Sequence, residues 1–512
     1  MDTLTAMRYQ TAISSVLAYN VFLIKEILVD NSDLIERPFT VTLDHELDGV
    51  IFYIDGLSNN QLISQALLDP LIHKSLEQEL LGGSRQQSIG TIEKILVTNP
   101  EVKIVKTVGE AIDNLLTGES IVVVEGLSKA FTMGTKGWEA RMPSEPATEL
   151  VVRGPRDSFT ENMRTNTSLL RRRIKDPMLR LKTQQIGTRT KTAVTIAYLE
   201  DVANQRIVMD VQERLQSIKI DAVLESGYLE EMITDARHSP FVTMKTTERP
   251  DAAAAAILEG RVVIISDNTP FSLIVPSYFW DGFMASDDYY ASYFLGTFSR
   301  IIRLIALVIS LTLPSLYVLL VSFHQEMIPT QLALSMAAGR ESVPFPVLVE
   351  VLLMEIAFEL MREAGLRMPR PVGQAVSIVG SLIIGQAAVQ AGLVSPIMVI
   401  IIAVTGIASF AIPSYATSFT IRFLRFPLLL ASGMLGLLGF TAVLYVLTVH
   451  ALSLQSFGEP YVAPIIPFRP SEQKDSLLRV PWWKMNTRPT FAKEKTRQPD
   501  PLDEQRKGQK SG

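Results

Sequence analysis

The stretch LIALVISLTLPSLYVLLVSF (304–323) contains no charged side chain. A helix needs about 20 mostly apolar residues to cross the roughly 30 Å hydrocarbon core of a bilayer, so this stretch predicts a transmembrane helix. Four later segments carry a similar signal: 346–361, 375–394, 396–413 and 427–450. The first of these is short and contains three glutamates. The sequence therefore predicts a bundle of about five transmembrane helices within 299–450.

The loops of this predicted bundle give its orientation. EMIPTQLALSMAAG (326–339) is too polar and too broken to span, and we expect it to lie at the interface or to re-enter the membrane. The arginines flank the spans on one side, and only Arg340 lies in the opposite set of short loops. Positive flanks mark the cytoplasmic side, so we expect the N-terminal region in the cytoplasm. Five spans would place the C-terminal tail on the other side, and a sixth span would reverse that conclusion.

The region before the bundle alternates strand and helix signals. VIFYIDG (50–56) is typical of a buried strand, and SIVVVEG (120–126) returns through SKAFTMG (128–134) as a hairpin. Further strands are predicted at 191–199, 218–223, 261–266 and 271–275, with helices near 160–173, 202–216, 226–236 and 250–259. The predicted fold class is a soluble α/β region of two subdomains with mixed sheets, followed by the helical bundle. We place the subdomains at 1–90 and 91–290, because the sequence loosens at GGSRQQSIG. A polar, Pro-rich tail follows at 451–512, and we expect its part at 469–512 to be extended.

Composition excludes several classes of function. The chain has no cysteine, so it has no disulfide or thiolate metal site, and its five histidines form no ligand cluster. The net charge of −5 argues against nucleic-acid binding. No catalytic triad, phosphate loop or cleavable signal peptide is recognisable. We expect a protein without catalytic activity, metal or cofactor.

The second predicted span, within VPFPVLVEVLLMEIAFELMREAGLRMPRP (343–371), is the most informative segment. Glu355, Glu359 and Glu363 recur every four residues and form one stripe on a helix, and Glu350 points roughly the opposite way. A carboxylate at membrane depth costs about 2.5–3.5 kcal/mol on insertion scales, so it needs water or a partner. Two interpretations remain open. The stripe lines a cation pathway in an oligomer, or it is paired internally with arginines and only stabilises the bundle.

Other residues are candidates for interhelical contacts. The candidates for ion pairing or for the membrane interface are Arg300, Arg303, Arg362, Arg367, Arg422 and Arg425. In the third predicted span, small residues allow helices to approach closely, and we expect a packing role for Gly380, Gly385, Ala388 and Gly392.

A family resemblance runs through the whole chain. The motifs that carry it are YIDGL (53–57), RGPRDSFTENMRTN (153–166), ERPDAAAAAILEGRVVIISDNTPFSLIVP (248–276), FHQEMIP (323–329), PFPVLVEVLLMEIAFELMREAGLRMP (344–369), VSIVGSLIIGQAAVQAGLVSP (376–396), IASFAIPSY (407–415), RFLRFP (422–427) and RVPWWKM (479–485). In their number and order, these motifs resemble the A subunit of the GerA-type spore germination receptors of endospore-forming bacteria. Gln390 departs from the pattern, since relatives often carry an acidic residue there.

The resemblance implies a multi-pass protein of the spore inner membrane, in contact with lipid. It would act with a transporter-like B subunit and a lipoprotein C subunit to detect nutrients such as amino acids or sugars. It implies a homo-oligomer that forms a nutrient-gated cation channel, with the nutrient pocket expected in the B subunit. A non-conducting scaffold or relay subunit is the alternative, and a secondary transporter is weaker because the spans show no inverted repeat.

Overall fold

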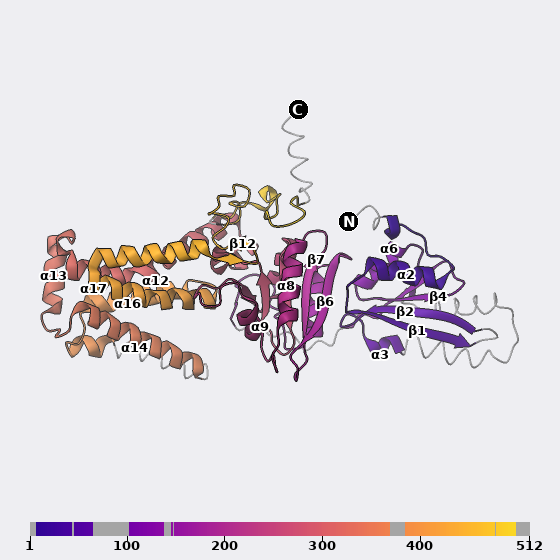
Figure 1. Cartoon of the computed structure of the whole chain (residues 1–512), viewed down its shortest axis with the longest axis horizontal. Helices are drawn as coiled ribbons and strands as arrows, with labels where there is room; N and C mark the ends of the chain where they lie inside the picture. The colour runs from indigo at the N-terminus through magenta and orange to yellow at the C-terminus, as the bar shows by residue number, and fades with distance from the viewer. Residues whose placement is uncertain are drawn as a thin grey trace, which may run out of the picture.

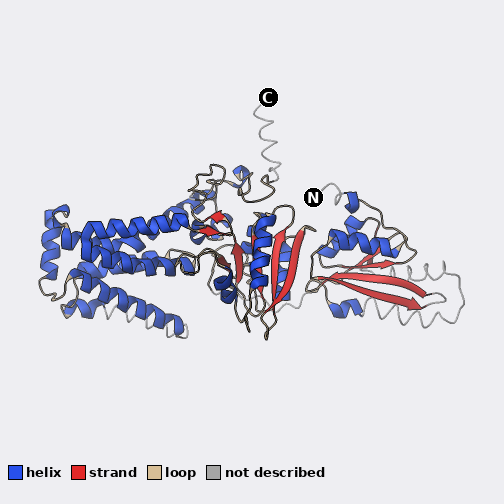
Figure 2. Ribbon diagram, viewed as in Figure 1, coloured by secondary structure: helices blue, strands red, loops and turns tan. Residues whose placement is uncertain are grey.

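The computed structural model describes residues 7–42, 46–64, 102–137, 145–146, 148–368, 385–476 and 478–497. Figure 1 shows three units in a row: an N-terminal α/β domain, a second α/β domain in the middle, and a helical bundle at the other end. Figure 2 shows that the sheets belong to the two α/β domains and that the bundle is helical.

The first domain is built on a five-stranded sheet in the order β1-β2-β4-β5-β3, in which every pair is antiparallel. Its strands are β1 (Leu34–Thr42), β2 (Glu46–Ile54), β3 (Val102–Val105), β4 (Ser120–Val124) and β5 (Ala130–Met133). Its helices are α2 (Leu17–Ile27), α3 (Asn60–Ile63) and α6 (Val108–Leu116). Apolar side chains of α2 and α6 pack on one face of the sheet and form its main core.

The second domain has a five-stranded antiparallel sheet in the order β6-β7-β9-β10-β8. Its strands are β6 (Leu179–Ile186), β7 (Thr192–Leu199), β8 (Lys245–Thr247), β9 (Val262–Ser266) and β10 (Ser272–Val275). Its helices are α7 (Met163–Arg173), α8 (Gln205–Ser217), α9 (Ser226–Ile233) and α10 (Pro250–Leu258), followed by η2 (Phe279–Phe283) and α11 (Asp287–Tyr290). Because side chains alternate along a strand, Ile264 packs under α8 and α9 while Ile265 packs under α7 and α10. The sheet is therefore covered on both faces.

Three predictions for this region are corrected. Both sheets are wholly antiparallel, so the prediction of mixed sheets is wrong. After β7 the chain first forms β8 at the far edge of the sheet, and it then returns to form β9 antiparallel to β7. The predicted division at residue 90 separates strands of one sheet, because β2, which precedes residue 90, pairs with β4, which follows it. Residues 218–223 form no strand and lie between α8 and α9.

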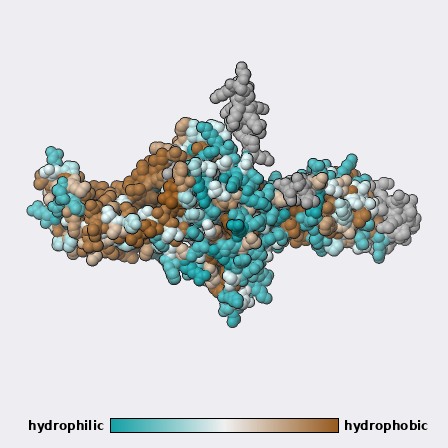
Figure 3. All heavy atoms as spheres, turned by 45° about the horizontal axis from the view of Figure 1, so that its top comes forward, coloured by the Kyte–Doolittle hydropathy of each residue, from teal (hydrophilic) through white to brown (hydrophobic). Residues whose placement is uncertain are grey.

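The bundle comprises α12 (Tyr293–Phe323), η3 (Gln325–Met327), α13 (Thr330–Arg340), α14 (Val347–Arg367), α16 (Pro396–Phe410) and α17 (Tyr415–Ser453). Among the described residues, α12 and α17 are long and apolar enough to cross a membrane, and α16 is a shorter apolar helix. The prediction at 346–361 falls within α14, and 326–339 includes most of α13. Most of the prediction at 375–394 lies outside the described residues. Figure 3 shows an apolar surface over the bundle between polar surfaces at its outer end and over the α/β domains.

The helix α17 is two antiparallel helices. Thr420 Oγ1 donates to the carbonyl of Pro240 at 2.7 Å, and His450 Nε2 lies 2.8 Å from Ser239 Oγ. In a straight helix these two positions would be about 45 Å apart, yet they contact adjacent residues of the second domain. Gly436 has φ 59° and ψ −137°, which is not helical. The chain therefore reverses at Gly436, and the predicted single span at 427–450 is wrong.

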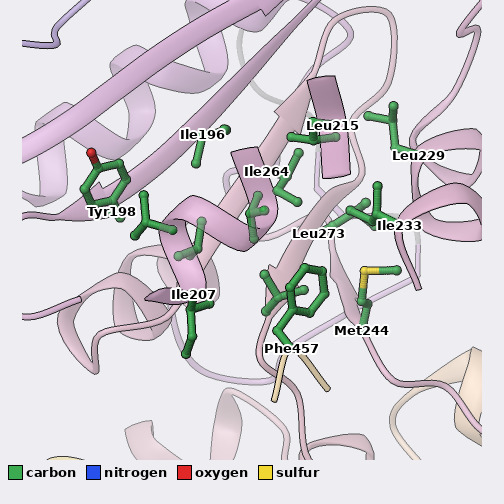
Figure 4. Close-up of a cluster of buried hydrophobic side chains, with 14 of the residues drawn as sticks. Ile196, Tyr198, Ile207, Leu215, Leu229, Ile233, Met244, Ile264, Leu273 and Phe457 are labelled. Atoms are coloured by element: carbon green, nitrogen blue, oxygen red, sulfur yellow. The ribbon is translucent and has the colours of Figure 1, made fainter. Parts of the chain in front are cut away.

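The C-terminal tail belongs to the second domain. It includes β11 (Gln455–Ser456), β12 (Glu459–Pro460) and η4 (Trp482–Lys484). Figure 4 shows Phe457 among Met244 and Leu273 of the domain core, and Phe491 is buried in the same cluster. The described part of the tail is therefore not extended, and it packs on the second domain, contrary to the placement that five spans would give it. The chain enters the bundle from the second domain and returns to that domain after α17. It therefore crosses the bundle an even number of times, and five spans do not fit.

Candidate functional site

The helix α14 has two contrasting faces. Its inner face is buried and includes Val351 and Met354 as well as two of the predicted carboxylates, Glu350 and Glu355, each with a fully buried side chain. Because residues three and four apart lie on one side of a helix, Glu359 and Arg362 continue this inner face. Glu350, Glu355 and Glu359 therefore point into their own bundle, whereas Glu363 is exposed.

Glu355 is paired with an arginine of α17. Arg425 Nη1 donates to Glu355 Oε2 at 2.7 Å, and both side chains are buried. Arg425 also donates from Nε to the carbonyl of Ser310 at 2.7 Å and from Nη2 to its hydroxyl at 3.0 Å. Thr312, two residues further along α12, donates its hydroxyl to the carbonyl of Val308. The ion pair thus joins α12, α14 and α17 deep in the bundle.

Glu359 lies one turn nearer the α/β domains and accepts from two arginines. Arg422 Nη1 donates to its Oε2 at 2.8 Å, and Arg362 Nη1 donates to its Oε1 at 3.1 Å. Arg362 Nη2 also donates to Ser409 Oγ at 3.1 Å, which brings in α16. The Arg362 guanidinium lies 4.8 Å from the ring centroid of Phe410, a cation–π contact.

The other two candidate carboxylates, Glu350 and Glu363, are bound in different ways. Glu350 Oε1 accepts from the backbone N–H of Ser395 at 2.6 Å, at the point where Ser395 caps α16, and Arg340 Nε lies 3.6 Å from its Oε2. Glu363 pairs with Arg367 at 2.6 Å on the surface. All four candidate pathway glutamates are thus already paired with a cation within one protomer. A cation moving along the stripe would have to compete with these arginines.

The remaining two candidate arginines tie α12 to the soluble part. Arg303 pairs with Asp288 at 2.7 Å, and Arg300 pairs with Asp288 at 3.3 Å and with Asp475 of the tail at 3.0 Å. Burial raises the pKa of Asp475 to about 6, against the opposing effect of the Arg300 charge. The beginning of α12 is therefore held by both the second domain and the tail.

Small residues allow close packing in the bundle. A Cβ on Gly385 would lie 3.5 Å from Val399 of α16, Ala388 is buried in the bundle core, and Gly392 has φ +65° against Ser342. Gly380 lies outside the described residues. Gly406, which the sequence did not single out, is more crowded, because a Cβ there would lie 2.7 Å from the ring of Phe358. The sequence could not identify Gly406, because it does not show that the ring of Phe358 on α14 lies against it.

The outer face of α14 is apolar. Val349, Leu353, Ile356 and Leu360 recur at helical spacing and are 41–65% exposed. A groove of about 310 Å³ runs beside this face and reaches Tyr415 of α17. Among the described residues, no cluster of His, Cys, Asp or Glu could hold a metal ion. The helix α14 thus has ion-paired side chains on its inner face and exposed apolar side chains on its outer face.

The fold and these contacts define a protein with two α/β domains and an apolar helical bundle that is held together by internal ion pairs. A family model described as Bacillus/Clostridium GerA spore germination protein matches residues 23–491. The chain therefore belongs to the GerA family of spore germination proteins, and its relatives are of the A-subunit type.

Three relatives illustrate the match. Spore germination protein KA of Bacillus subtilis (strain 168) is 43% identical over 93% of this chain and 87% of its own length. The uncharacterized membrane protein YfkQ of the same organism is 41% identical over 93% and 92%. Spore germination protein GerLA of Bacillus cereus is 38% identical over 87% and 89%. One solved structure also matches: the crystal structure of the N-terminal domain of the A subunit of the Bacillus megaterium spore germinant receptor GerK3. Its sequence is 34% identical, and the match covers 52% of this chain and 98% of that one with a TM-score of 0.42.

Proposed function

We propose that this chain is the A subunit of a nutrient germinant receptor in the spore inner membrane, and that copies of it assemble into a cation channel that opens on nutrient sensing. It acts without catalysing a reaction, beside a transporter-like B subunit and a lipoprotein C subunit. Membership of the GerA family supports the receptor role.

The outer face of α14 is the observation that carries the channel proposal. Copies arranged around an axis would bring Leu353, Ile356 and Leu360 together as rings. Hydrophobic constrictions of this kind gate channels by excluding water. The ion pairs on the inner face would hold α14 in each protomer while the apolar rings open and close. Glu363 and Arg367, both exposed, would lie at the mouth beside the α/β domains.

The charge distribution supports a cytoplasmic position for the α/β domains. Arg300, Arg303 and Arg367 lie toward the end of the bundle beside these domains, whereas Arg340 lies at the opposite end. Positive residues near the ends of spans face the cytoplasm. The tail, which packs on the second domain, would then be cytoplasmic as well.

A non-conducting scaffold is the second candidate, and the ion pairs favour it. Glu355 and Glu359 are each paired with an arginine of the same protomer, as expected of residues that only hold helices together. In this case the bundle anchors the receptor, and the α/β domains relay the signal.

Potassium release from spores that carry Ile356→Ser separates the two candidates. A serine in an apolar gate admits water, so the channel predicts release of potassium and germination without nutrient. The matched control is Val308→Ser, on an exposed apolar position of α12, which should respond to nutrient as the unmodified chain does. Loss of the nutrient response without leak, or an unchanged response at normal protein level, would contradict the channel.

A further inference from the structure

The tail segment RVPWWKM (479–485) is held against the beginning of α12. The carbonyl of Arg479 accepts from Thr297 Oγ1 at 3.1 Å, and its backbone N–H donates to the same oxygen at 3.2 Å. The Arg479 guanidinium donates to the carbonyls of Ala291 and Tyr289, at 2.9 and 3.2 Å. The backbone that leads into η4 is therefore fixed at one place beside the first turns of α12.

Two neighbouring tryptophans of η4 are exposed at this place. Trp482 is 54% exposed and Trp483 is 45% exposed. The ring centroid of Trp482 lies 6.0 Å from that of Tyr289, and the centroid of Trp483 lies 6.0 Å from that of Tyr293, the first residue of α12. Exposed apolar surface of this kind marks a site of contact with a partner or with a membrane.

The exposed side of α12 is apolar from its first turn onward. Phe294, Phe298, Ile301, Ile305 and Val308 recur at helical spacing and are 41–69% exposed. The stripe contains no charge and leads into the charge-free stretch 304–323 of a helix that is long and apolar enough to cross a membrane. The surface that would face lipid therefore begins at the first turn of α12.

The tryptophans lie where this apolar stripe begins. Trp483 contacts Tyr293, whose ring centroid is 4.1 Å from that of Phe294, the first residue of the stripe. Lys484 follows the pair and is exposed. Tryptophan and tyrosine are enriched at membrane–water interfaces, because an apolar ring with one polar group suits the level of the lipid head groups. Lysine extends its charged end from this level into water.

We propose that Trp482 and Trp483 insert into the lipid bilayer at the boundary between head groups and acyl chains, in the leaflet next to the α/β domains. The partner is thus the lipid surface itself. The inference rests on the proposed membrane location of the bundle and does not depend on the channel. The bonds of Arg479 would keep both indole rings at a constant depth relative to α12.

An anchor at this position would also hold the second domain. Phe491, six residues after η4 begins to leave the surface at Met485, is buried in the core of that domain. The chain between the indole rings and this core is short. The anchored tail would therefore fix the distance between the second domain and the membrane.

Fluorescence quenching by brominated lipids tests the proposal. The full chain would be reconstituted in vesicles of phosphatidylglycerol and phosphatidylcholine, with bromine either next to the head group or near the ends of the acyl chains. Bromine next to the head group should quench the tryptophan emission more strongly. Most of this quenching should be lost in the double variant Trp482→Phe and Trp483→Phe, which keeps an aromatic ring at both positions and should fold.

Two further tryptophans, each placed in the double variant, serve as controls. Val308→Trp, further along the apolar stripe of α12, should be quenched by bromine near the chain ends, because it reports whether the bundle lies in lipid. Met209→Trp, on an exposed position of α8, should not be quenched by either lipid.

The proposal is overturned if Val308→Trp is quenched while the double variant is quenched as strongly as the unmodified chain, because water or another protein then surrounds the tail tryptophans. Stronger quenching of the tail tryptophans by bromine near the chain ends would contradict an interfacial depth. If Val308→Trp is not quenched, the proposed membrane location of the bundle fails, and this inference fails with it.

Discussion

The two faces of α14 differ in charge and in burial. The inner face carries charge, and Glu355 and Glu359 are paired with arginines of α17. The outer face carries no charge between Val349 and Leu360, and Ile356 and Leu360 are uncovered among the described residues. Charged side chains inside this bundle therefore hold helices of one protomer together. The surface left for other copies, or for a pathway between them, is apolar.

The largest expected effect comes from breaking the inner ion pair. Glu355→Gln leaves Arg425 buried without its counter-charge, which should destabilise the bundle by about 3–5 kcal/mol. Glu363→Gln breaks an exposed pair on the same helix and should cost less than about 1 kcal/mol. Chemical unfolding of the chain in detergent, followed by its helical signal, measures both. Equal losses would show that the inner face is not special.

A smaller effect is expected from crowding the inner face. Gly406→Ala places a Cβ against the ring of Phe358 and should cost about 1–3 kcal/mol, because the packed ring must move. Gly339→Ala on α13 is the control, since its Cβ would lie 3.7 Å from Pro396 in ordinary contact. That change should be neutral or stabilise the chain by about 0.5–1 kcal/mol. The same unfolding measurement applies, and a neutral Gly406→Ala would show that α14 and α16 pack loosely.

The smallest effect is expected on the outer face. Leu360→Ala should change the unfolding free energy of the protomer by less than about 0.5 kcal/mol, because the side chain is 65% exposed. Met354→Ala on the inner face should cost about 2–5 kcal/mol. If Leu360→Ala is as damaging as Met354→Ala, the outer face is covered within the protomer, and the contrast between the faces fails.

The sequence predicted the elements of the fold better than their arrangement. The helix signals at 202–216 and 250–259 were sufficient to place α8 and α10. Alternation of strand and helix signals carries no direction, so mixed sheets were expected where antiparallel pairs form. The apolar run at 427–450 has the length of one span, and only the backbone conformation of Gly436 divides it. Local pattern does not encode such long-range geometry.

The candidate site shows the same limit. Spacing of four residues identified the carboxylate stripe and left two roles open. Spacing could not supply the partners, because the pairing of Glu355 with Arg425 depends on how two helices far apart in the chain are rotated against each other. Ser310 and Ser409 were missed because a serine in an apolar helix has no signal of its own until an arginine faces it.

Because the chain contains no cysteine, cysteine accessibility can test whether water reaches the outer face of α14. Ile356→Cys on the outer face and Met354→Cys on the inner face would be treated with a water-soluble, membrane-impermeant thiosulfonate, in membranes that contain the assembled receptor. Position 356 should react when nutrient is added, and position 354 should stay protected in both states. Reaction at 354, or protection of 356 with and without nutrient, would contradict a water-filled path along the outer face of α14.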